Sequence, residues 1–173
     1  MIYPPPNDEV TPFLTASGQP KDTSHSVQHL SRRQPRSDAR RLKILLAEDN
    51  DVDVWLFREA FQALGLPHQL EIAPDGEQAL ARLRTRPLPD LILLDLNMPK
   101  LDGFEVLSAI RADPKLCLIP VIILSSSRDP KDVRRAQQLG ANSYLCKSTE
   151  DFSDLVGDFD RYWLRRAELP DLS

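Results

Sequence analysis

Five polar residues stand where apolar runs of the sequence end. Glu48 and Asp49 close the first run, Asp95 closes the third, Ser125 the fourth and Lys147 the fifth. A single aspartate at such a point could simply begin a loop. Three carboxylates, a hydroxyl and an ammonium at the ends of four runs instead predict one shared site, because the carboxyl ends of parallel strands meet at one edge of a sheet.

The chemistry that suits this residue set is phosphoryl transfer assisted by a hard metal ion. Three close carboxylates repel one another unless a cation joins them. Oxygen ligands without histidine or cysteine favour Mg²⁺, which also binds phosphate oxygens. A carboxylate such as Asp95 can act as the nucleophile and form an acyl phosphate. Lys147 and Ser125 would then hold the other phosphoryl oxygens by charge and by hydrogen bonding.

Short apolar runs alternate with amphipathic stretches from residue 42 onward. The runs predict strands at 42–47, 69–73, 91–95, 120–125 and 142–147. The stretches between and after them predict helices at about 52–64, 77–83, 104–112, 129–139 and 152–163. The expected apolar face of the first helix consists of Val52, Trp55, Leu56, Ala60, Phe61 and Leu64. Five βα units predict an α/β fold, a doubly wound (βα)5 domain whose parallel five-stranded sheet is covered on both faces.

Composition indicates a globular protein of the cytoplasm. Hydrophobic residues make up 41% of the chain and charged residues 28%, and we find neither a membrane-length apolar stretch nor a secretory signal. The two cysteines, Cys117 and Cys146, predict no disulfide framework and no metal site. The chain has 22 basic and 26 acidic residues, of which five basic and four acidic residues lie in residues 1–40. Residues 41–173 therefore carry 17 basic and 22 acidic residues, a net charge of −5. This balance argues against nucleic-acid binding.

Residues 1–40 differ in composition from the rest of the chain. They hold six of the 15 prolines, are rich in serine and other polar residues, and show no apolar periodicity. Such a segment cannot bury enough apolar surface to offset its ordering entropy. We therefore predict a flexible tail at 1–40 and a single folded domain at 41–173, with an extended last helix and a short tail.

The folded part resembles the receiver domain of two-component response regulators. The matching motifs are Glu48-Asp49, the segment from Asp95 to Gly103, Ser125, and Gly140-Ala141 with Tyr144 and Lys147. The resemblance implies the strand order 2-1-3-4-5. It also implies a phosphoacceptor switch rather than an enzyme, with self-catalysed phosphoryl transfer from a histidine kinase and slow autodephosphorylation.

The resemblance assigns a role to each site residue. Asp95 would accept the phosphoryl group, and Mg²⁺ would be held by Glu48, Asp49, Asp95 and the backbone carbonyl of Asn97. Lys147 would contact the phosphoryl group, Ser125 would swing in to bond it, and Tyr144 would change rotamer with Ser125. The residues two positions after Asp95 and Ser125, Asn97 and Ser127, would tune hydrolysis.

The sequence departs from the family pattern at two positions. Glu48 stands where aspartate is commoner, which lengthens one arm of the metal site and keeps its charge. Ser148 follows Lys147 where the family usually has proline after a cis peptide bond. A cis bond before serine costs roughly 2.5–4 kcal/mol, so the sequence leaves the geometry of this bond open.

Finer motifs resemble the single-domain regulators that pair with phytochrome histidine kinases. They include Glu48-Asp49-Asn50, Ser125-Ser126-Ser127 and a long last helix that ends with Tyr162, Trp163 and Leu164. We expect no output domain in the residues after Glu150. The output would then be a downstream partner, a step in a phosphorelay, or a homodimer formed through the C-terminal helix region. The alternative for the three apolar residues at the helix end is that they fold back on the domain.

Two other functions remain possible on the sequence. An Asp-nucleophile phosphatase of the haloacid-dehalogenase type wants a second aspartate two residues after the nucleophile, where this chain has Asn97. A degenerate receiver would bind partners without phosphorylation, but the intact Asp49, Asp95, Ser125 and Lys147 argue against it. The sequence does not identify the cognate kinase, the downstream target, the dimer face or the lifetime of an acyl phosphate.

Overall fold

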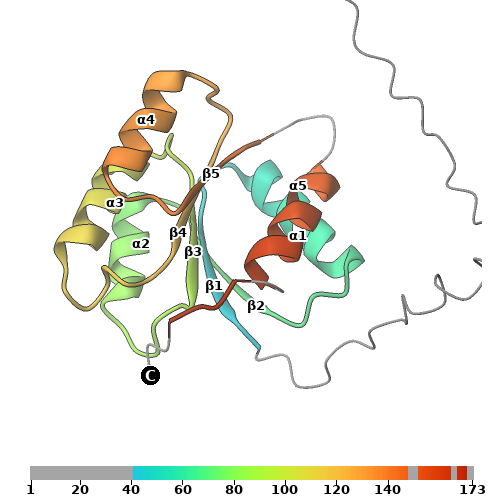
Figure 1. Ribbon diagram of the computed structural model, residues 1–173. Coiled ribbons are helices and arrows are strands. Elements are labelled where there is room, and N and C mark those ends of the chain that lie inside the picture. Colours follow the sequence, from blue (N-terminus) through green and yellow to red (C-terminus); the bar gives the residue numbers. More distant parts are fainter. Residues whose placement is uncertain (1–40, 148–151, 165–166, 171–173) are drawn as a thin grey trace, which may run out of the picture. The chain divides into compact units, whose positions relative to one another are not determined.

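One parallel sheet organises the domain. A computed structural model of the chain describes residues 41–147, 152–164 and 167–170. Its strands are β1 (Lys43–Ala47), β2 (Gln69–Ala73), β3 (Leu91–Leu94), β4 (Val121–Ser125) and β5 (Ser143–Cys146). They lie in the order β2-β1-β3-β4-β5 and all pairs are parallel (Figure 1). The predicted (βα)5 doubly wound fold and its strand order are confirmed.

The helices begin where short polar side chains can cap them. They are α1 (Asp51–Ala63), α2 (Gly76–Leu83), α3 (Gly103–Ala112), α4 (Pro130–Gln138) and α5 (Phe152–Phe159), which continues as a π-helix, η1 (Asp160–Leu164). The residues before the first four, Asn50, Asp75, Asp102 and Asp129, each accept a hydrogen bond from a backbone N–H of the first turn. Because all strand pairs are parallel, the loops that carry these four caps lie at the carboxyl edge of the sheet.

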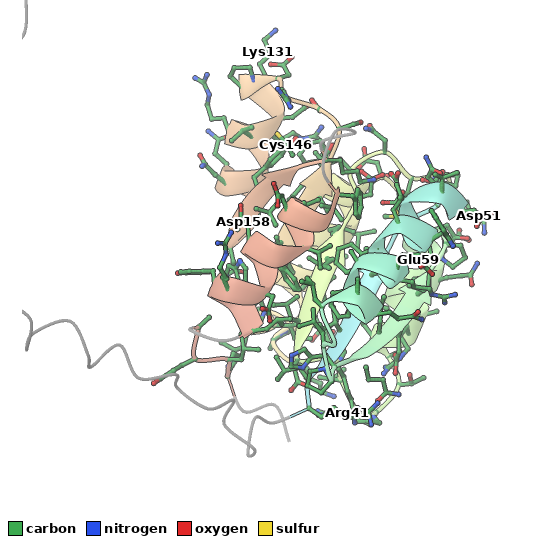
Figure 2. All side chains as sticks on the ribbon, turned by 90° about the vertical axis from the view of Figure 1, so that its right-hand side faces the viewer. Arg41, Asp51, Glu59, Lys131, Cys146 and Asp158 are labelled. Carbon is green, nitrogen blue, oxygen red and sulfur yellow. The ribbon has the colours of Figure 1, made fainter. Side chains whose placement is uncertain are left out.

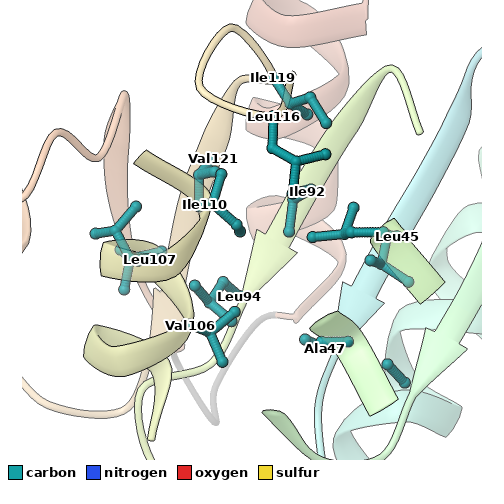
Figure 3. Packing of buried hydrophobic residues seen from close by; sticks show 14 of the residues in the cluster. Leu45, Ala47, Ile92, Leu94, Val106, Leu107, Ile110, Leu116, Ile119 and Val121 are labelled. Atoms are coloured by element: carbon teal, nitrogen blue, oxygen red, sulfur yellow. The ribbon is translucent and has the colours of Figure 1, made fainter. Parts of the chain in front are cut away.

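The helices form one layer on each face of the sheet. α1 and α5 cover one face, while α2, α3 and α4 cover the other (Figure 1). Alternate strand residues point into the two layers, as the pleat requires. Leu45, Ala47, Ile92, Leu94 and Val121 pack under α2 and α3, and their side chains are almost fully buried (Figure 3). Because both faces are packed, the strand ends that carry the polar residues are held firmly.

The buried face of α1 differs from the predicted face. Phe57, Ala60 and Phe61 are buried, whereas Val52 and Trp55 are 62% and 59% exposed. The ring of Phe57 packs within 5.0 Å of Phe61, and it also contacts Phe152 and Phe159 of α5. The aromatic contacts with α5 therefore set the rotation of α1 about its own axis. The prediction that Trp55 lies on the buried face of this helix is wrong. Figure 2 looks onto this pair of helices.

The apolar end of the last helix is divided between the domain and the solvent. Trp163 and Leu164 are half-buried and, together with Leu169, pack against the core on the α1 and α5 side of the sheet. Tyr162 is 60% exposed, and its ring meets that of Trp163 edge to face at 5.2 Å between centroids. Two of the three residues thus fold back on the domain.

Some predictions fall outside the described residues. They are the flexible tail at 1–40 and the geometry of the peptide bond between Lys147 and Ser148. Among the helices that the structure describes, none combines the length and the apolar character needed to cross a membrane.

Candidate functional site

The predicted site residues meet at the carboxyl edge of the sheet. Backbone hydrogen bonds prolong the strand pairing by one residue and hold three of them in place. The N–H of Glu48 donates to the carbonyl of Ala73 at 2.9 Å, that of Asp95 to Ala47 at 3.0 Å, and that of Lys147 to Ser125 at 2.8 Å. The register of the sheet therefore brings residues that lie 52 and 99 positions apart in the sequence within contact of one another.

The three carboxylates lie close enough together to share one cation. Glu48, Asp49 and Asp95 each offer an oxygen, and these oxygens lie within 4.8 Å of one another. Glu48 is 1% and Asp95 5% exposed, while Asp49 is exposed at the mouth of the site. All-oxygen ligands of this charge fit a hard divalent ion such as Mg²⁺. The part of the Asn97 carbonyl as a further ligand stays a prediction.

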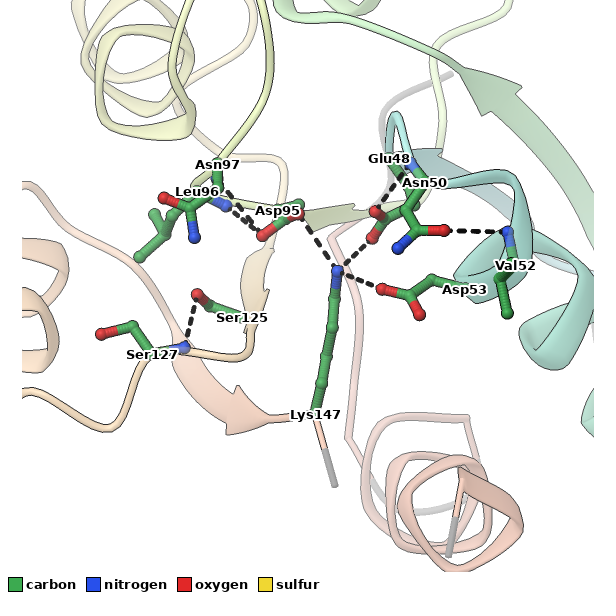
Figure 4. Close-up of polar contacts among 10 residues, drawn as sticks. All are labelled: Glu48, Asn50, Val52, Asp53, Asp95, Leu96, Asn97, Ser125, Ser127 and Lys147. Atoms are coloured by element: carbon green, nitrogen blue, oxygen red, sulfur yellow. Dashed lines mark hydrogen bonds and ion pairs between the residues drawn. The ribbon is translucent and has the colours of Figure 1, made fainter. Parts of the chain in front are cut away.

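Lys147 is the cation at the centre of the site (Figure 4). Its Nζ donates to Glu48 Oε2 at 2.5 Å, to Asp53 Oδ2 at 2.9 Å and to Asp95 Oδ2 at 3.1 Å. The side chain is only 10% exposed. Burial acts to lower the pKa of Lys147, but the hydrogen bond to Glu48, the charge of Asp95 and the bond to Asp53 outweigh it and raise that pKa. Lys147 therefore carries a permanent positive charge beside the carboxylate of Asp95.

Burial works against the negative charge of Glu48. Burial raises the pKa of Glu48 to about 7, even though the hydrogen bond from Lys147 and the bond from the Asn50 N–H act to lower it. Its side chain is 1% exposed. A buried carboxylate of this kind is stabilised by a cation, which is the ammonium of Lys147 here.

Asp95 presents one oxygen to Lys147 and turns the other to its own loop. Its Oδ1 accepts hydrogen bonds from the backbone N–H groups of Leu96 at 2.6 Å and Asn97 at 3.3 Å. Its Oδ2 faces Lys147. The carboxylate is therefore oriented from both sides, as a nucleophile that must meet an incoming group in line requires.

The hydroxyl residues connect the site to the loop before α4. Ser125 is fully buried, and its Oγ accepts a hydrogen bond from the Ser127 N–H at 3.2 Å. The Ser127 Oγ donates to Asp132 Oδ2 at 2.6 Å, and the Ser127 carbonyl accepts from the Tyr144 hydroxyl at 2.9 Å. Ser125, Ser127 and Tyr144 thus share one hydrogen-bonded loop that ends in the first turn of α4. Burial raises the pKa of the Tyr144 hydroxyl, which stays protonated.

Two residue pairs in and beside the site escape prediction from the sequence. Asp53 lies four residues after Asp49, and only the structure brings it to Lys147. Lys100, in the loop after β3, adopts a φ of 68° and donates to the Asp75 carboxylate at 2.6 Å. The Asp75-Gly76 pair indicates a turn, but the sequence carries no signal that its carboxylate anchors the loop following Asp95.

Comparison with known proteins agrees with this architecture. Residues 44–157 match the model of the response regulator receiver domain. The probable methanogenesis regulatory protein FilR2 of Methanothrix harundinacea is 44% identical over 128 residues, which cover 70% of this chain and 83% of that protein.

Two solved structures share both the fold and the sequence pattern. The Mn²⁺-bound form of response regulator Rcp1, a Synechocystis protein, is 39% identical with a TM-score of 0.71, over 75% of this chain and 99% of that one. The phosphorylated cyanobacterial phytochrome response regulator RcpA is 40% identical with a TM-score of 0.72, over 76% of this chain and 99% of that one. The resemblance inferred from the motifs is confirmed, and the chain belongs to the family of response regulator receiver domains.

Proposed function

We propose that this receiver domain accepts a phosphoryl group on Asp95 from a histidine kinase. Proteins of this family are in general phosphoacceptors rather than enzymes. The observation that carries the proposal for this chain is the placement of Asp95. Its buried carboxylate lies between two further carboxylates and the ammonium of Lys147, at 3.1 Å from Nζ.

The transfer is a substitution at phosphorus. An Asp95 carboxylate oxygen attacks the phosphorus of a phosphohistidine and forms the P–O bond of an acyl phosphate. The P–N bond breaks, its electron pair stays on the imidazole nitrogen, and that nitrogen takes a proton. Lys147 stabilises the charge on the transferred oxygens, and Ser125 donates to one of them once its hydroxyl turns toward Asp95. Glu48, Asp49 and Asp95 would hold Mg²⁺, which supplies further neutralisation of that charge.

The chain itself supplies the positioning for this transfer, so that a small phosphodonor can replace the kinase. Hydrolysis of the acyl phosphate would be slow and under the control of Asn97 and Ser127. The backbone N–H of Asn97 donates to the Asp95 carboxylate at 3.3 Å, and the backbone N–H of Ser127 donates to the Ser125 hydroxyl oxygen at 3.2 Å.

The partner we propose is a sensor histidine kinase, with a bacteriophytochrome as the specific candidate. The similarity to RcpA, a phytochrome response regulator, supports this choice. We place the exchange in the cytoplasm, the compartment that the unpaired thiols of Cys117 and Cys146 favour.

The test is the mass of the intact protein after incubation with acetyl phosphate and Mg²⁺. Wild type should gain the mass of one phosphoryl group, whereas Asp95→Asn should gain none. Omission of Mg²⁺, or its removal by a chelator, should abolish the gain in wild type. An unmodified wild type would refute the phosphoacceptor function and leave a module that binds partners without phosphorylation.

We further propose that the output is a homodimer formed through the C-terminal helix region. The support is the resemblance to the single-domain regulators, and the ring of Tyr162, 60% exposed near the end of the α5–η1 segment, is the group that we expect at the interface. Light scattering after gel filtration should give twice the chain mass with beryllofluoride present, and Tyr162→Glu should weaken the association. A monomer both with and without beryllofluoride would contradict this proposal.

A further inference from the structure

Asp53 reaches the site from α1 and contacts none of the residues expected to react. It is the third residue of α1, and its side chain is 23% exposed. Its Oδ2 lies 2.9 Å from Nζ of Lys147 (Figure 4). Among the hydrogen bonds of the described residues, the one to this lysine connects Asp53 to the site.

The three partners of Lys147 differ in what else they must do. An ammonium has three N–H donors, and Lys147 directs them to Glu48, Asp53 and Asp95. Glu48 and Asp95 belong to the group of carboxylates that can hold a metal ion, together with Asp49. A cation and a phosphoryl group would both draw on those carboxylates. Asp53 lies outside the metal-binding group, so a metal ion held by that group would leave the bond between Asp53 and Lys147 in place.

A role limited to α1 does not explain the direction of the Asp53 side chain. A carboxylate at the third position of a helix often accepts from the backbone N–H of the N-cap residue. Here the N–H of the N-cap residue, Asn50, donates to Glu48 Oε1 at 3.2 Å. The N-cap function itself belongs to Asn50, whose Oδ1 accepts from the Val52 N–H at 2.9 Å. The first turn is capped without Asp53, which points instead toward Lys147.

We propose that Asp53 is a positioning residue that keeps the Lys147 ammonium beside Asp95 when the other two carboxylates are engaged. The proposal rests on the phosphoacceptor function of Asp95. It requires that Asp53 act through Lys147 and accept its hydrogen bond, and that the negative charge of Asp53 contribute little beyond that bond.

The kinetic test compares three variants by the initial rate of acyl phosphate formation with acetyl phosphate and Mg²⁺. Asp53→Ala should slow the reaction about five-fold, the rate equivalent of about 1 kcal/mol for a partly exposed ion pair. Asp53→Asn keeps an oxygen that can accept from Lys147 and should restore most of the rate. Asp51→Ala, which removes the same charge from the same turn of α1, is the matched control and should react like wild type.

A double-mutant cycle separates action through Lys147 from a general effect on the fold. In a Lys147→Ala background, removal of the Asp53 carboxylate should cause no further loss of rate. The four proteins of this cycle are wild type, Asp53→Ala, Lys147→Ala and the double variant. Their urea unfolding in the absence of metal should show a favourable coupling free energy between Asp53 and Lys147, a result that does not depend on phosphorylation.

The outcomes distinguish this inference from the function on which it rests. A wild-type rate for Asp53→Ala, an equal loss in the Lys147→Ala background, or zero coupling in urea would overturn the positioning role and leave the phosphoacceptor function intact. Failure of Asp53→Asn to restore the rate would show that the charge matters rather than the bond. Failure of wild type itself to take up phosphate would overturn both.

Discussion

Substitution of Gly103 by alanine should damage the site without changing any of its polar side chains. Gly103 begins α3, and its N–H donates to the Leu96 carbonyl at 3.0 Å. A Cβ placed on Gly103 would lie 2.1 Å from the carbonyl oxygen of Asp95 and 2.8 Å from Cα of Leu96. Both obstacles are backbone atoms, so no side-chain rotation can relieve the clash. The helix therefore packs directly on the backbone of the proposed phosphoacceptor.

The size of the effect follows from these distances. Because real Cβ atoms essentially never approach other heavy atoms within 3.0 Å, the 2.1 Å contact must open by roughly 1 Å. Overpacking of this kind costs about 1–3 kcal/mol of the free energy of unfolding. A shift of Asp95 by a similar distance relative to Lys147 can slow the reaction up to about 100-fold.

Two assays on Gly103→Ala test this reasoning. Urea unfolding should give the predicted loss of stability, and intact-mass kinetics with acetyl phosphate should give the predicted loss of rate. Gly157→Ala is the matched control, because a Cβ at Gly157 in α5 meets nothing within 4 Å. It should stabilise the protein by about 0.5–1 kcal/mol and react like wild type. Wild-type stability and rate in Gly103→Ala would refute the close packing of α3 on Asp95.

Three further substitutions probe contacts around the site. The hydrogen bond from Lys100 lowers the pKa of Asp75 to about 2 from its usual 3.8. The ionised carboxylate therefore stabilises the fold at pH values above 3.8, and this stabilisation is lost as the pH falls toward 2. Urea unfolding should therefore show the advantage of wild type over Asp75→Asn at pH 6 and its decline at lower pH; a constant difference would contradict the ion pair. Arg111 donates to three backbone carbonyls near the amino ends of β4 and β5. Arg111→Ala should therefore lose about 2 kcal/mol of unfolding free energy and keep the phosphorylation rate of wild type. A lower rate would contradict a purely structural role of Arg111. Tyr144→Phe removes the bond to the Ser127 carbonyl and should lose about 1 kcal/mol in the same assay, whereas an unchanged value would mean that this bond adds nothing.

The strand ends were accessible from the sequence because short-range patterns encode them. The residues of β3 and the first four residues of β4 are apolar without alternation, which is the signature of strands buried on both faces. Parallel pairing then forces their carboxyl ends to one edge. These two facts place Asp95 and Lys147 at the same edge of the sheet, and their contact depends in addition on the strand order β2-β1-β3-β4-β5.

The contacts of α1 were not accessible in the same way. Its sequence contains two overlapping apolar stripes, one with Trp55 and one with Phe57, and spacing alone fits both. The choice depends on the rings of Phe152 and Phe159, which approach from α5 about a hundred residues later. The bond of Asp53 to Lys147 depends on the same rotation of α1, so it too requires the assembled tertiary structure.

The most direct test of Asp95 as the phosphoryl acceptor is to map the acyl phosphate within the chain. After reaction with acetyl phosphate and Mg²⁺, borohydride reduces an aspartyl phosphate to homoserine, which tandem mass spectrometry of peptides locates. The structure predicts the reduced residue at position 95, and at no other carboxylate of the site. Reduction at Asp49 or Asp53 instead, or none in protein that has gained the phosphoryl mass, would contradict the assignment of Asp95.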